Sequence, residues 1–311
     1  MSITVDIDKR SGFCAGVIAA ITTAEKYLET SKEKCLFSLG SIVHNEEELA
    51  RLESKGLITI DNEDLDEMVS AEGKTLLIRA HGEPPKTYSR AEKLGFQVID
   101  CTCPVVLQLQ KSIREAYVRL HDNGAEGQIL IYGKEGHAEV LGLLGQVEGD
   151  ALVYENEEQL NRLIAEGKIR LSGPIEVFSQ TTKSPSEYTR TTEVLARAMA
   201  TAAGDTVAHM LTLGVLHVHD TICAQVATRF KNLSDFDLAH DVIIFVSGKT
   251  SSNGRVLCEL CKSVNIRTYH IGSIEELKRE WFGKDDKVGV CGATSTPKWL
   301  LEQVAQKIAN L

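Results

Sequence analysis

One arrangement of residues recurs three times along the chain and constrains its fold more than any other feature. Each copy begins with a cysteine directly before an amphipathic helical stretch, at Cys14, Cys103 and Cys223. Between 25 and 30 residues later, a strand ends at a glycine and a polar loop follows. A second polar loop comes 41 to 48 residues after that glycine. Three similar units in one chain predict three similar domains.

Continuous apolar runs alternate with these helical stretches. Such runs are typical of parallel strands that are buried on both faces, and helical stretches between them indicate βαβ units. The clearest runs are residues 75–80, 128–133, 175–180, 241–248 and 287–292. We therefore predict an α/β fold of three similar α/β domains with mostly parallel sheets. If these domains are arranged around a pseudo-threefold axis, their equivalent loops and the three cysteines would meet at a central metal-cluster site.

The repeat also predicts where the domains begin and end. The expected ranges are a first α/β domain at 1–102, a second at 103–218, a third at 219–295 and a C-terminal helix near the site at 296–311.

Composition excludes several classes of function. A net charge of −10 argues against broad nucleic-acid binding, which requires a basic surface. No apolar run approaches the roughly 18 residues of a membrane span, and the first residues, M-S-I-T-V-D-I-D, do not resemble a signal peptide. We expect a cytoplasmic protein. Its eight cysteines are then expected to be buried, to bind metal or to be catalytic, rather than to form disulfides.

The three repeated cysteines favour a metal centre. A thiol at the N-terminal end of a helix is stabilised as a thiolate, because that end is partially positive. Three thiolates around one point need a cation or cluster to balance their charge. Zinc would take a fourth ligand or water. A 4Fe–4S cluster is usually held by four cysteines, so three would leave one iron open to a substrate.

The polar loops suggest an anionic substrate. Hydrogen-bond donors gather at predicted helix starts, where anions bind readily; they are His44, His81, His137, Thr181, Ser251, Ser252, Asn253 and Ser295. Many converging donors suit a phosphate or diphosphate. Ordinary helix capping also explains Ser, Thr and Asn, but it does not explain three histidines.

One carboxylate is singled out as a proton donor. Glu139 follows His137 by two residues in the G-H-A-E loop, and we expect it to act as a general acid. Glu46 occupies the matching place in the first unit, but it lies in an E-E-E run that we interpret as the solvated first turn of a helix.

The remaining cysteines receive structural roles. In D-C-T-C-P (100–104), Cys103 is the expected ligand because it directly precedes Pro104 and the helix, and Cys101 is a deeper neighbour on the strand. The C-E-L-C segment (258–261) is interpreted as packing plus one semi-exposed thiol. Cys35 and Cys291 are expected to be buried.

Nine segments together resemble 4-hydroxy-3-methylbut-2-enyl diphosphate reductases, the family that catalyses the last step of the methylerythritol phosphate route to isoprenoids. The segments are F-C-A-G-V (13–17), V-H-N-E (43–46), R-A-H-G (79–82), D-C-T-C-P (100–104), G-H-A-E (136–139), S-Q-T-T (179–182), D-T-I-C (220–223), S-S-N (251–253) and Ser-x-Pro (295–297). The resemblance covers essentially the whole chain. This chain has G-H-A-E where the family commonly has G-H-P-E, and its last loop, C-G-A-T-S-T-P, replaces the common A-G-A-S.

The resemblance implies a specific site. One 4Fe–4S cluster per chain would be held by Cys14, Cys103 and Cys223. Thr181 and Glu139 would face the substrate hydroxyl beside His137, and these three residues would be the catalytic set. The diphosphate would be bound by His44, His81, His137, Ser251, Ser252, Asn253 and Ser295, with Thr181 completing the substrate contacts.

The resemblance also implies the reaction. The hydroxyl of (E)-4-hydroxy-3-methylbut-2-enyl diphosphate would bind the open iron and leave as water after protonation. Two electrons, delivered singly by a ferredoxin or flavodoxin, and a final proton would give isopentenyl and dimethylallyl diphosphate. The diphosphate itself is a candidate source of that last proton.

Two other functions compete with this interpretation. A zinc or thiol enzyme would use the Cys101–Cys103 or Cys258–Cys261 pair, and a binding protein for a phosphorylated metabolite would perform no chemistry.

Overall fold

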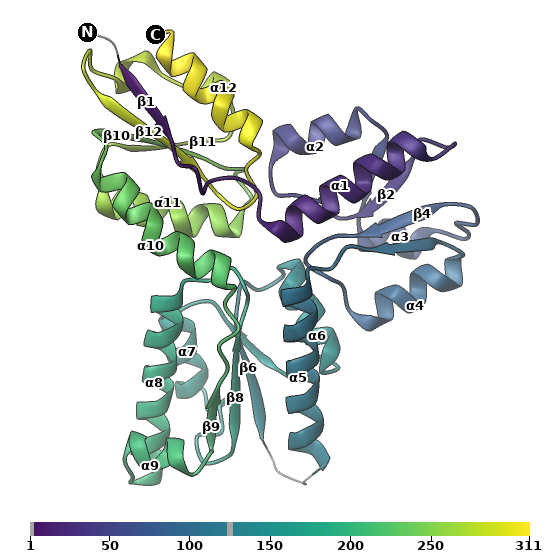
Figure 1. Ribbon diagram of the computed structural model, residues 1–311. Coiled ribbons are helices and arrows are strands. Elements are labelled where there is room, and N and C mark those ends of the chain that lie inside the picture. The colour runs from purple at the N-terminus through teal and green to yellow at the C-terminus, as the bar shows by residue number, and fades with distance from the viewer. Residues whose placement is uncertain (1–2, 123–126) are drawn as a thin grey trace. The chain divides into compact units, whose positions relative to one another are not determined.

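The computed structural model describes residues 3–122 and 127–311. Its strands form three four-stranded sheets, and every strand pair in them is parallel. Figure 1 shows helices alternating with these strands along the chain. The predicted α/β class, with three similar domains and mostly parallel sheets, is confirmed.

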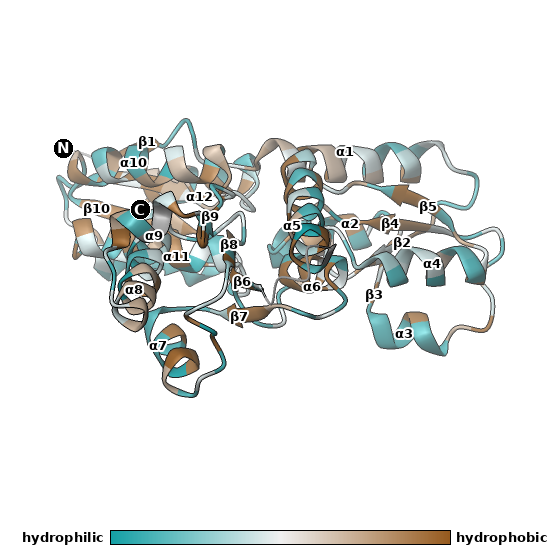
Figure 2. Cartoon of the chain, turned by 90° about the horizontal axis from the view of Figure 1, so that it is seen from below, coloured by the Kyte–Doolittle hydropathy of each residue, from teal (hydrophilic) through white to brown (hydrophobic). Residues whose placement is uncertain are grey.

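The first sheet is formed by residues before Cys101. Its strands, in spatial order, are β3 (Leu57–Ile60), β2 (Leu36–Leu39), β4 (Thr75–Ile78) and β5 (Gln97–Asp100). The helices in this part of the chain are α1 (Ala15–Thr30), α2 (Glu46–Glu53), α3 (Asn62–Glu67) and α4 (Pro85–Leu94). Figure 2 shows hydrophobic residues along β2, β4 and β5, whereas α3 is largely hydrophilic. Burial accounts for the largely apolar sequences of β2 and β4, whereas β5 is only partly buried and begins and ends with a polar residue.

The second sheet has the same spatial order. Its strands are β7 (Leu152–Tyr154), β6 (Gln128–Tyr132), β8 (Ile175–Ser179) and β9 (Leu216–Val218). The helices of this segment are α5 (Pro104–Asp122), α6 (Ala138–Gln146), α7 (Glu157–Ala165), α8 (Pro185–Ala203) and α9 (Val207–Thr212). Helices α5 and α6 cover one face of the sheet, and α7 and α8 cover the other (Figure 1).

Alternation along the strands builds both of these cores. In β6, Ile129 and Ile131 face α5 and α6, whereas Leu130 and Tyr132 pack on the side of α7 and α8. All four are fully or almost fully buried. Because both faces of this strand are buried, side chains on either face must be apolar to pack well, which explains the apolar run from Ile129 to Tyr132.

The third sheet has the same spatial order of strands as the first two, but one of its strands comes from the N-terminal end of the chain. It comprises β11 (Thr268–Ile271), β10 (Val242–Val246), β12 (Lys287–Gly292) and the N-terminal β1 (Thr4–Ile7). The helices are α10 (Ala224–Leu238), α11 (Ser252–Val264) and α12 (Lys298–Ala309), with short 3-10 helices at Ile274–Glu276 and Arg279–Trp281. The helix expected in the C-terminal segment is thus present as α12.

In every sheet, the strand that follows the cysteine-led helix lies second from one edge, and the next strand in sequence lies outside it. The repeat seen in the sequence therefore corresponds to one repeated βαβ arrangement. In the third sheet Thr4 pairs with Lys287 and Ile7 with Val290, so the N-terminal strand completes the C-terminal copy. The domain boundaries expected from sequence stay a prediction.

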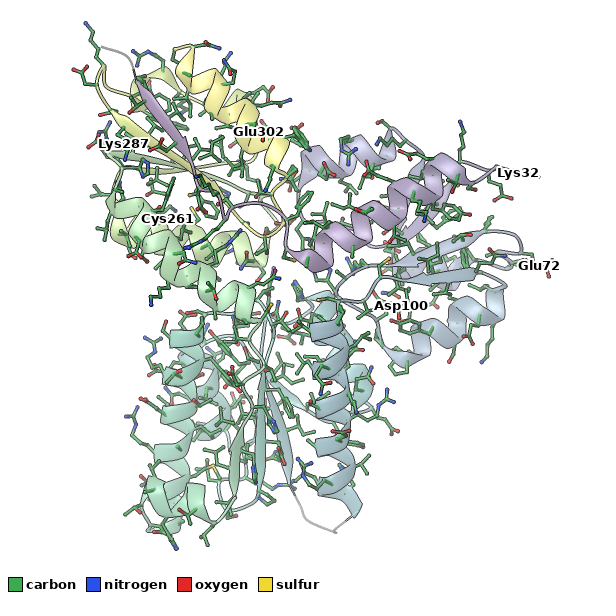
Figure 3. All side chains as sticks on the ribbon, in the orientation of Figure 1. Lys32, Glu72, Asp100, Cys261, Lys287 and Glu302 are labelled. Carbon is green, nitrogen blue, oxygen red and sulfur yellow. The ribbon has the colours of Figure 1, made fainter. Side chains whose placement is uncertain are left out.

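Two compact units can be distinguished in the chain. The first comprises Met1–Ala80, Ala91–Thr102 and Ala224–Leu311, and the second comprises His81–Arg90 and Cys103–Cys223. In both, side chains fill the space between helices and strands (Figure 3). Within the described residues, no helix combines the length and the apolar character needed to cross a membrane.

Candidate functional site

The three repeated cysteines lie directly before helices. Cys14 precedes α1, Cys103 precedes α5 and Cys223 precedes α10. The carbonyls of Cys14 and Cys103 accept helix-starting hydrogen bonds from the backbone N–H groups of Ile18 and Leu107. All three side chains are partly exposed, and none is in a disulfide. Each of the three sulfur atoms therefore lies at the partially positive end of a helix, where a metal can reach it.

An open cavity of about 510 Å³ lies beside Cys14 in the first unit. The Cys14 N–H donates a hydrogen bond to the carbonyl of Thr294, at 3.1 Å, on the cavity wall. Arg229 also lines the cavity and is buried; its Nη1 donates to the carbonyl of Gly292 at 3.1 Å. A guanidinium held in this way places positive charge near the Cys14 thiol.

In the second unit, Glu139 lies in the first turn of α6 and is only 1% exposed. The backbone N–H of Thr181 donates to Oε1 at 2.7 Å, and the Thr181 hydroxyl donates to Oε2 at 2.9 Å. Burial raises the pKa of Glu139 to about 7, although both hydrogen bonds act in the opposite direction. The carboxyl group is therefore poised to hold or release a proton near neutral pH.

Thr181 also connects this acid to one of the cysteines. Its carbonyl accepts a hydrogen bond from the backbone N–H of Cys223 at 3.0 Å. Thr181 thus contacts Glu139 through its N–H and hydroxyl groups and Cys223 through its carbonyl group. The sequence analysis named all three, and the structure brings them together within one unit.

His137 forms the N-terminal cap of α6. Its Nδ1 accepts a hydrogen bond from the backbone N–H of Glu139 at 3.2 Å, which leaves Nε2 as the ring nitrogen able to donate. The ring of His81 lies edge-to-face against His137, with centroids 5.3 Å apart. The argument that histidine does not serve as a cap was therefore wrong for His137. The two imidazoles nevertheless gather donors at one helix start, as expected for an anion site.

Ser251, Asn253 and Ser295 come together in the first unit. Ser251 caps α11 by accepting a hydrogen bond from the Gly254 N–H at 3.0 Å, and its hydroxyl lies 3.1 Å from that of Ser295. Asn253 Oδ1 accepts from the backbone and side chain of Thr294, at 3.2 and 2.9 Å. The Nδ2 group of Asn253 is buried, and no acceptor for it is found in the described part of the chain. An unused donor at a helix start fits an anionic ligand. Ser252 is the first residue of the same helix and is partly exposed.

The loop that contains His44 packs directly against the loop after β10. A Cβ atom on Gly248 would lie only 2.3 Å from the His44 carbonyl oxygen, so only glycine fits between the two backbones. Within the first unit, His44 therefore lies next to the loop that leads to Ser251. The separation in sequence is about 200 residues, and no local signal in the sequence connects the two segments.

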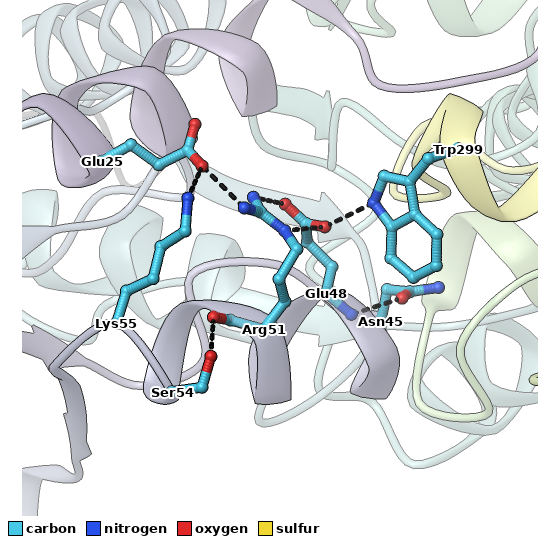
Figure 4. A network of polar contacts seen from close by, with 7 residues as sticks. All are labelled: Glu25, Asn45, Glu48, Arg51, Ser54, Lys55 and Trp299. Carbon is cyan, nitrogen blue, oxygen red and sulfur yellow. Dashed lines mark hydrogen bonds and ion pairs between the residues drawn. The ribbon is translucent and has the colours of Figure 1, made fainter.

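Sequence reasoning missed one buried acid next to this region. Glu48, the last residue of the E-E-E run, is 1% exposed, whereas Glu46 and Glu47 are exposed as expected. Arg51 donates to both carboxylate oxygens of Glu48, and Trp299 Nε1 donates to Oε2 at 2.9 Å (Figure 4). The interpretation of the whole run as solvated was therefore wrong. Through Trp299, two residues after Pro297, this acid anchors the start of α12.

We expect Trp299→Phe to destabilise the protein by about 1–2 kcal/mol, because a buried carboxylate loses a hydrogen bond while Arg51 still pairs with it. The measurement is urea unfolding, followed by circular dichroism. The matched control is Trp281→Phe, since the ring of Trp281 stacks on Tyr269 and that contact survives the change. Equal midpoints for wild type and Trp299→Phe would contradict this account.

The remaining cysteines differ in environment from the three repeated ones. Cys101 packs against the core beneath α1, and burial raises the pKa of its thiol. Cys258 and Cys261 are both buried, so the expectation of one semi-exposed thiol in C-E-L-C was wrong. Their spacing of three residues places both on the helix face that packs against the sheet. Cys291 is buried as expected, whereas Cys35 is partly exposed.

Comparison with known proteins identifies the family. Residues 5–309 match the model of the family described as LytB protein. The chain belongs to the LytB family. A LytB relative from Bacteroides fragilis, named 4-hydroxy-3-methylbut-2-enyl diphosphate reductase, is 45% identical over 98% of this chain and 97% of its own length. A relative of the same name from Chloroherpeton thalassium is 42% identical over 98% of this chain and 96% of its own.

Solved structures agree with the LytB assignment. One, described as (E)-4-hydroxy-3-methyl-but-2-enyl diphosphate reductase, the terminal enzyme of the non-mevalonate pathway, is 32% identical, covers 99% of this chain and all of its own, and has a TM-score of 0.64. The Plasmodium falciparum E-1-hydroxy-2-methyl-but-2-enyl-4-diphosphate reductase has a TM-score of 0.78 over 98% of this chain and 88% of its own. At 24% identity, it supports the LytB fold alone. The family assignment made from the sequence motifs is confirmed.

Proposed function

We propose that this protein reduces (E)-4-hydroxy-3-methylbut-2-enyl diphosphate to isopentenyl and dimethylallyl diphosphate. The reaction replaces a C–OH bond with a C–H bond and consumes two electrons and two protons, with water as the second product. The observation that carries the proposal is the buried Glu139, whose pKa of about 7 suits a proton donor and which Thr181 connects to Cys223. The name shared by relatives that match nearly the whole chain supports the same reaction.

Cys14, Cys103 and Cys223 are the proposed ligands of one 4Fe–4S cluster per chain. Their residue type and position fit such a group, because each is a partly exposed thiol at the start of a long helix, unlike the buried Cys258, Cys261 and Cys291. When bound, the cluster would supply electrons one at a time and a Lewis-acidic iron. In this proposal the cluster lies on the predicted pseudo-threefold axis, and a ferredoxin or flavodoxin in the cytoplasm is the electron donor.

The proposed diphosphate ligands are donors located at helix starts. Ser251, Ser252 and Asn253 lie at the start of α11, with Ser295 beside Ser251, and the buried Nδ2 group of Asn253 is available to an acceptor. His137 and His81 provide imidazole donors at the start of α6. His44 completes the proposed set. Many fixed donors match the many acceptor oxygens of a diphosphate.

Glu139 is the proposed source of the proton that converts the leaving hydroxyl into water. With a pKa of about 7, a substantial fraction of the carboxyl groups is protonated at neutral pH. Both of its oxygens are fixed by Thr181, so the group cannot rotate freely away from the substrate. Thr181 is the proposed second contact to the substrate hydroxyl, and His137 orients the first turn of α6 that carries Glu139.

The test is an anaerobic preparation of the full chain. We expect a brown protein with about four irons per chain that converts the hydroxy-diphosphate to the two products, detected by gas chromatography of the released alcohols, with a reduced viologen as electron source. A colourless protein without turnover after anaerobic reconstitution would overturn the proposal. Tight diphosphate binding without turnover in the iron-loaded protein would instead support a binding function.

A further inference from the structure

A second group of potential metal ligands lies in the core of the first unit, between α10, α11 and β12. Asp237 on α10, Cys261 on α11 and Cys291 on β12 each place one ligand atom within 4.8 Å of the other two. All three residues are fully buried. Figure 3 shows Cys261 inside this layer, on the helix that packs against the sheet.

Asp237 is in an unfavourable position for a carboxylate. It lies in the last turn of α10, where the partial negative charge of the helix end repels an anion. Among the described residues, no nitrogen or oxygen donor reaches either of its carboxylate oxygens, and the thiol of Cys261 faces it. A fully buried carboxylate without such donors costs several kcal/mol unless a proton or a cation compensates it.

Protonation is one way to offset this cost. Burial raises the pKa of Asp237 to about 6, and burial also raises the pKa of the Cys291 thiol. The pKa of Cys261 is raised by its neighbour Cys291 and by burial. His240, two residues after α10 ends, does not hydrogen-bond to the Asp237 carboxylate, because its Nε2 is paired with Asp6. A divalent cation that displaced the protons would offset two of the three negative charges of these ligands.

We propose that Asp237, Cys261 and Cys291 form a buried binding site for a thiophilic divalent cation such as Zn²⁺. Thiolates that bind one zinc at the usual Zn–S distance lie roughly 3.8 Å apart, so small rotations of the three side chains suffice. Cys258 is buried in the same apolar cluster, one helical turn before Cys261, but it is not part of the group of three whose ligand atoms lie within 4.8 Å of one another. Tetrahedral zinc with cysteine and carboxylate ligands is redox-silent and structural.

Such an ion would connect three elements of the third sheet and its helices without taking part in the reduction. The site is distinct from the proposed cluster ligands, which are partly exposed and lie at helix starts. Because zinc binds only the folded arrangement of these ligands, it should stabilise the protein against unfolding.

The experiment measures zinc content and affinity in the full chain. The parent carries Cys14→Ser, Cys103→Ser and Cys223→Ser, which remove the other thiol site. After zinc addition and gel filtration, we expect about one zinc per chain by mass spectrometry of the metal. Competition with a chromogenic chelator then gives the affinity. Adding Asp237→Asn or Cys291→Ala to the parent should weaken zinc binding by roughly 100-fold or more. Losing a residue that only hydrogen-bonds to a metal ligand can already cost that much.

Cys35→Ser in the same parent is the matched control, because Cys35 is partly exposed and outside the buried cluster, and it should leave zinc binding unchanged. Zinc should also raise the melting temperature of the parent, but not that of the two site variants. The proposal is overturned if the parent binds no zinc, if both site variants bind as the parent does, or if peptide mapping finds Cys261 and Cys291 joined in a disulfide. None of these results bears on the reductase, because the parent lacks its cluster ligands.

Discussion

Glu139→Gln is expected to lower turnover by roughly 10²–10⁴-fold, while the substrate still binds with nearly wild-type affinity. Glutamine keeps the shape and most of the contacts to Thr181, but it cannot supply a proton to the leaving hydroxyl. The measurement compares kcat and the substrate dissociation constant in anaerobic preparations with equal iron content. Turnover close to that of the wild type would remove Glu139 from the mechanism.

The matched control for this change is Glu176→Gln. Glu176 is a second buried glutamate of the same unit, 2% exposed, and it pairs with Arg119 and His219 instead of a proposed site residue. Its loss should reduce stability but leave kcat of the folded enzyme near the wild-type value. A similar fall in kcat for both variants would mean that burial of charge, and not proton donation, explains the effect.

The pH dependence of stability provides an independent signature of Glu139. Its pKa is about 7 in the folded protein and 4.5 ordinarily, so the folded state binds the proton more tightly. The resulting stabilisation is fully present below pH 4.5 and is lost as the pH rises through 7, which corresponds to roughly 3 kcal/mol. Urea unfolding of Glu139→Gln should lack this component between about pH 5 and pH 8.

The second large effect is expected at Cys103. Cys103→Ser should prevent assembly of a complete 4Fe–4S cluster and reduce activity to background, because a serine hydroxyl is a poor substitute for a thiolate ligand. The readouts are iron and sulfide content, the Mössbauer spectrum and turnover after anaerobic reconstitution.

Cys101→Ser, only two positions away, is the control for Cys103→Ser. Cys101 packs against the core beneath α1, and burial raises the pKa of its thiol, which disfavours the thiolate that a cluster needs. This variant should retain cluster and turnover and lose some stability. The reverse pattern, with Cys101→Ser inactive and Cys103→Ser active, would reassign the ligand.

The sequence was sufficient to predict the central strands and the cysteine-led helices. β6, β8 and β10 bury both faces, so they are rich in apolar residues; β10 is wholly apolar, and β8 is interrupted by Glu176 and Ser179. Short edge strands carried no comparable signal. β1 has alternating exposed and partly buried residues, and its partner Lys287–Val290 lies at the other end of the chain.

Individual candidate residues could be named from the sequence, but the contacts between them could not. Glu139 could be selected from its position after His137, yet the two hydrogen bonds from Thr181 join residues 42 positions apart. Glu48 was wrongly predicted to be solvated, because the acidic sequence around it does not reveal the hydrogen bond that Trp299, about 250 residues later, donates to it. The burial of both Cys258 and Cys261 could have been predicted, because their spacing of three residues places them on the same face of a helix.

The pairing of β1 with β12 also affects how the protein must be made. A ribosome delivers roughly 5–20 residues per second, so the strand Thr4–Ile7 emerges on the order of tens of seconds before its partner Lys287–Val290 exists. During synthesis the first two sheets can form from chain that is already available, whereas the third must wait for the last residues. The nascent chain therefore carries this strand unpaired until Lys287–Val290 has been synthesised, and any tag or fusion placed before Thr4 is attached to one of the last segments to fold.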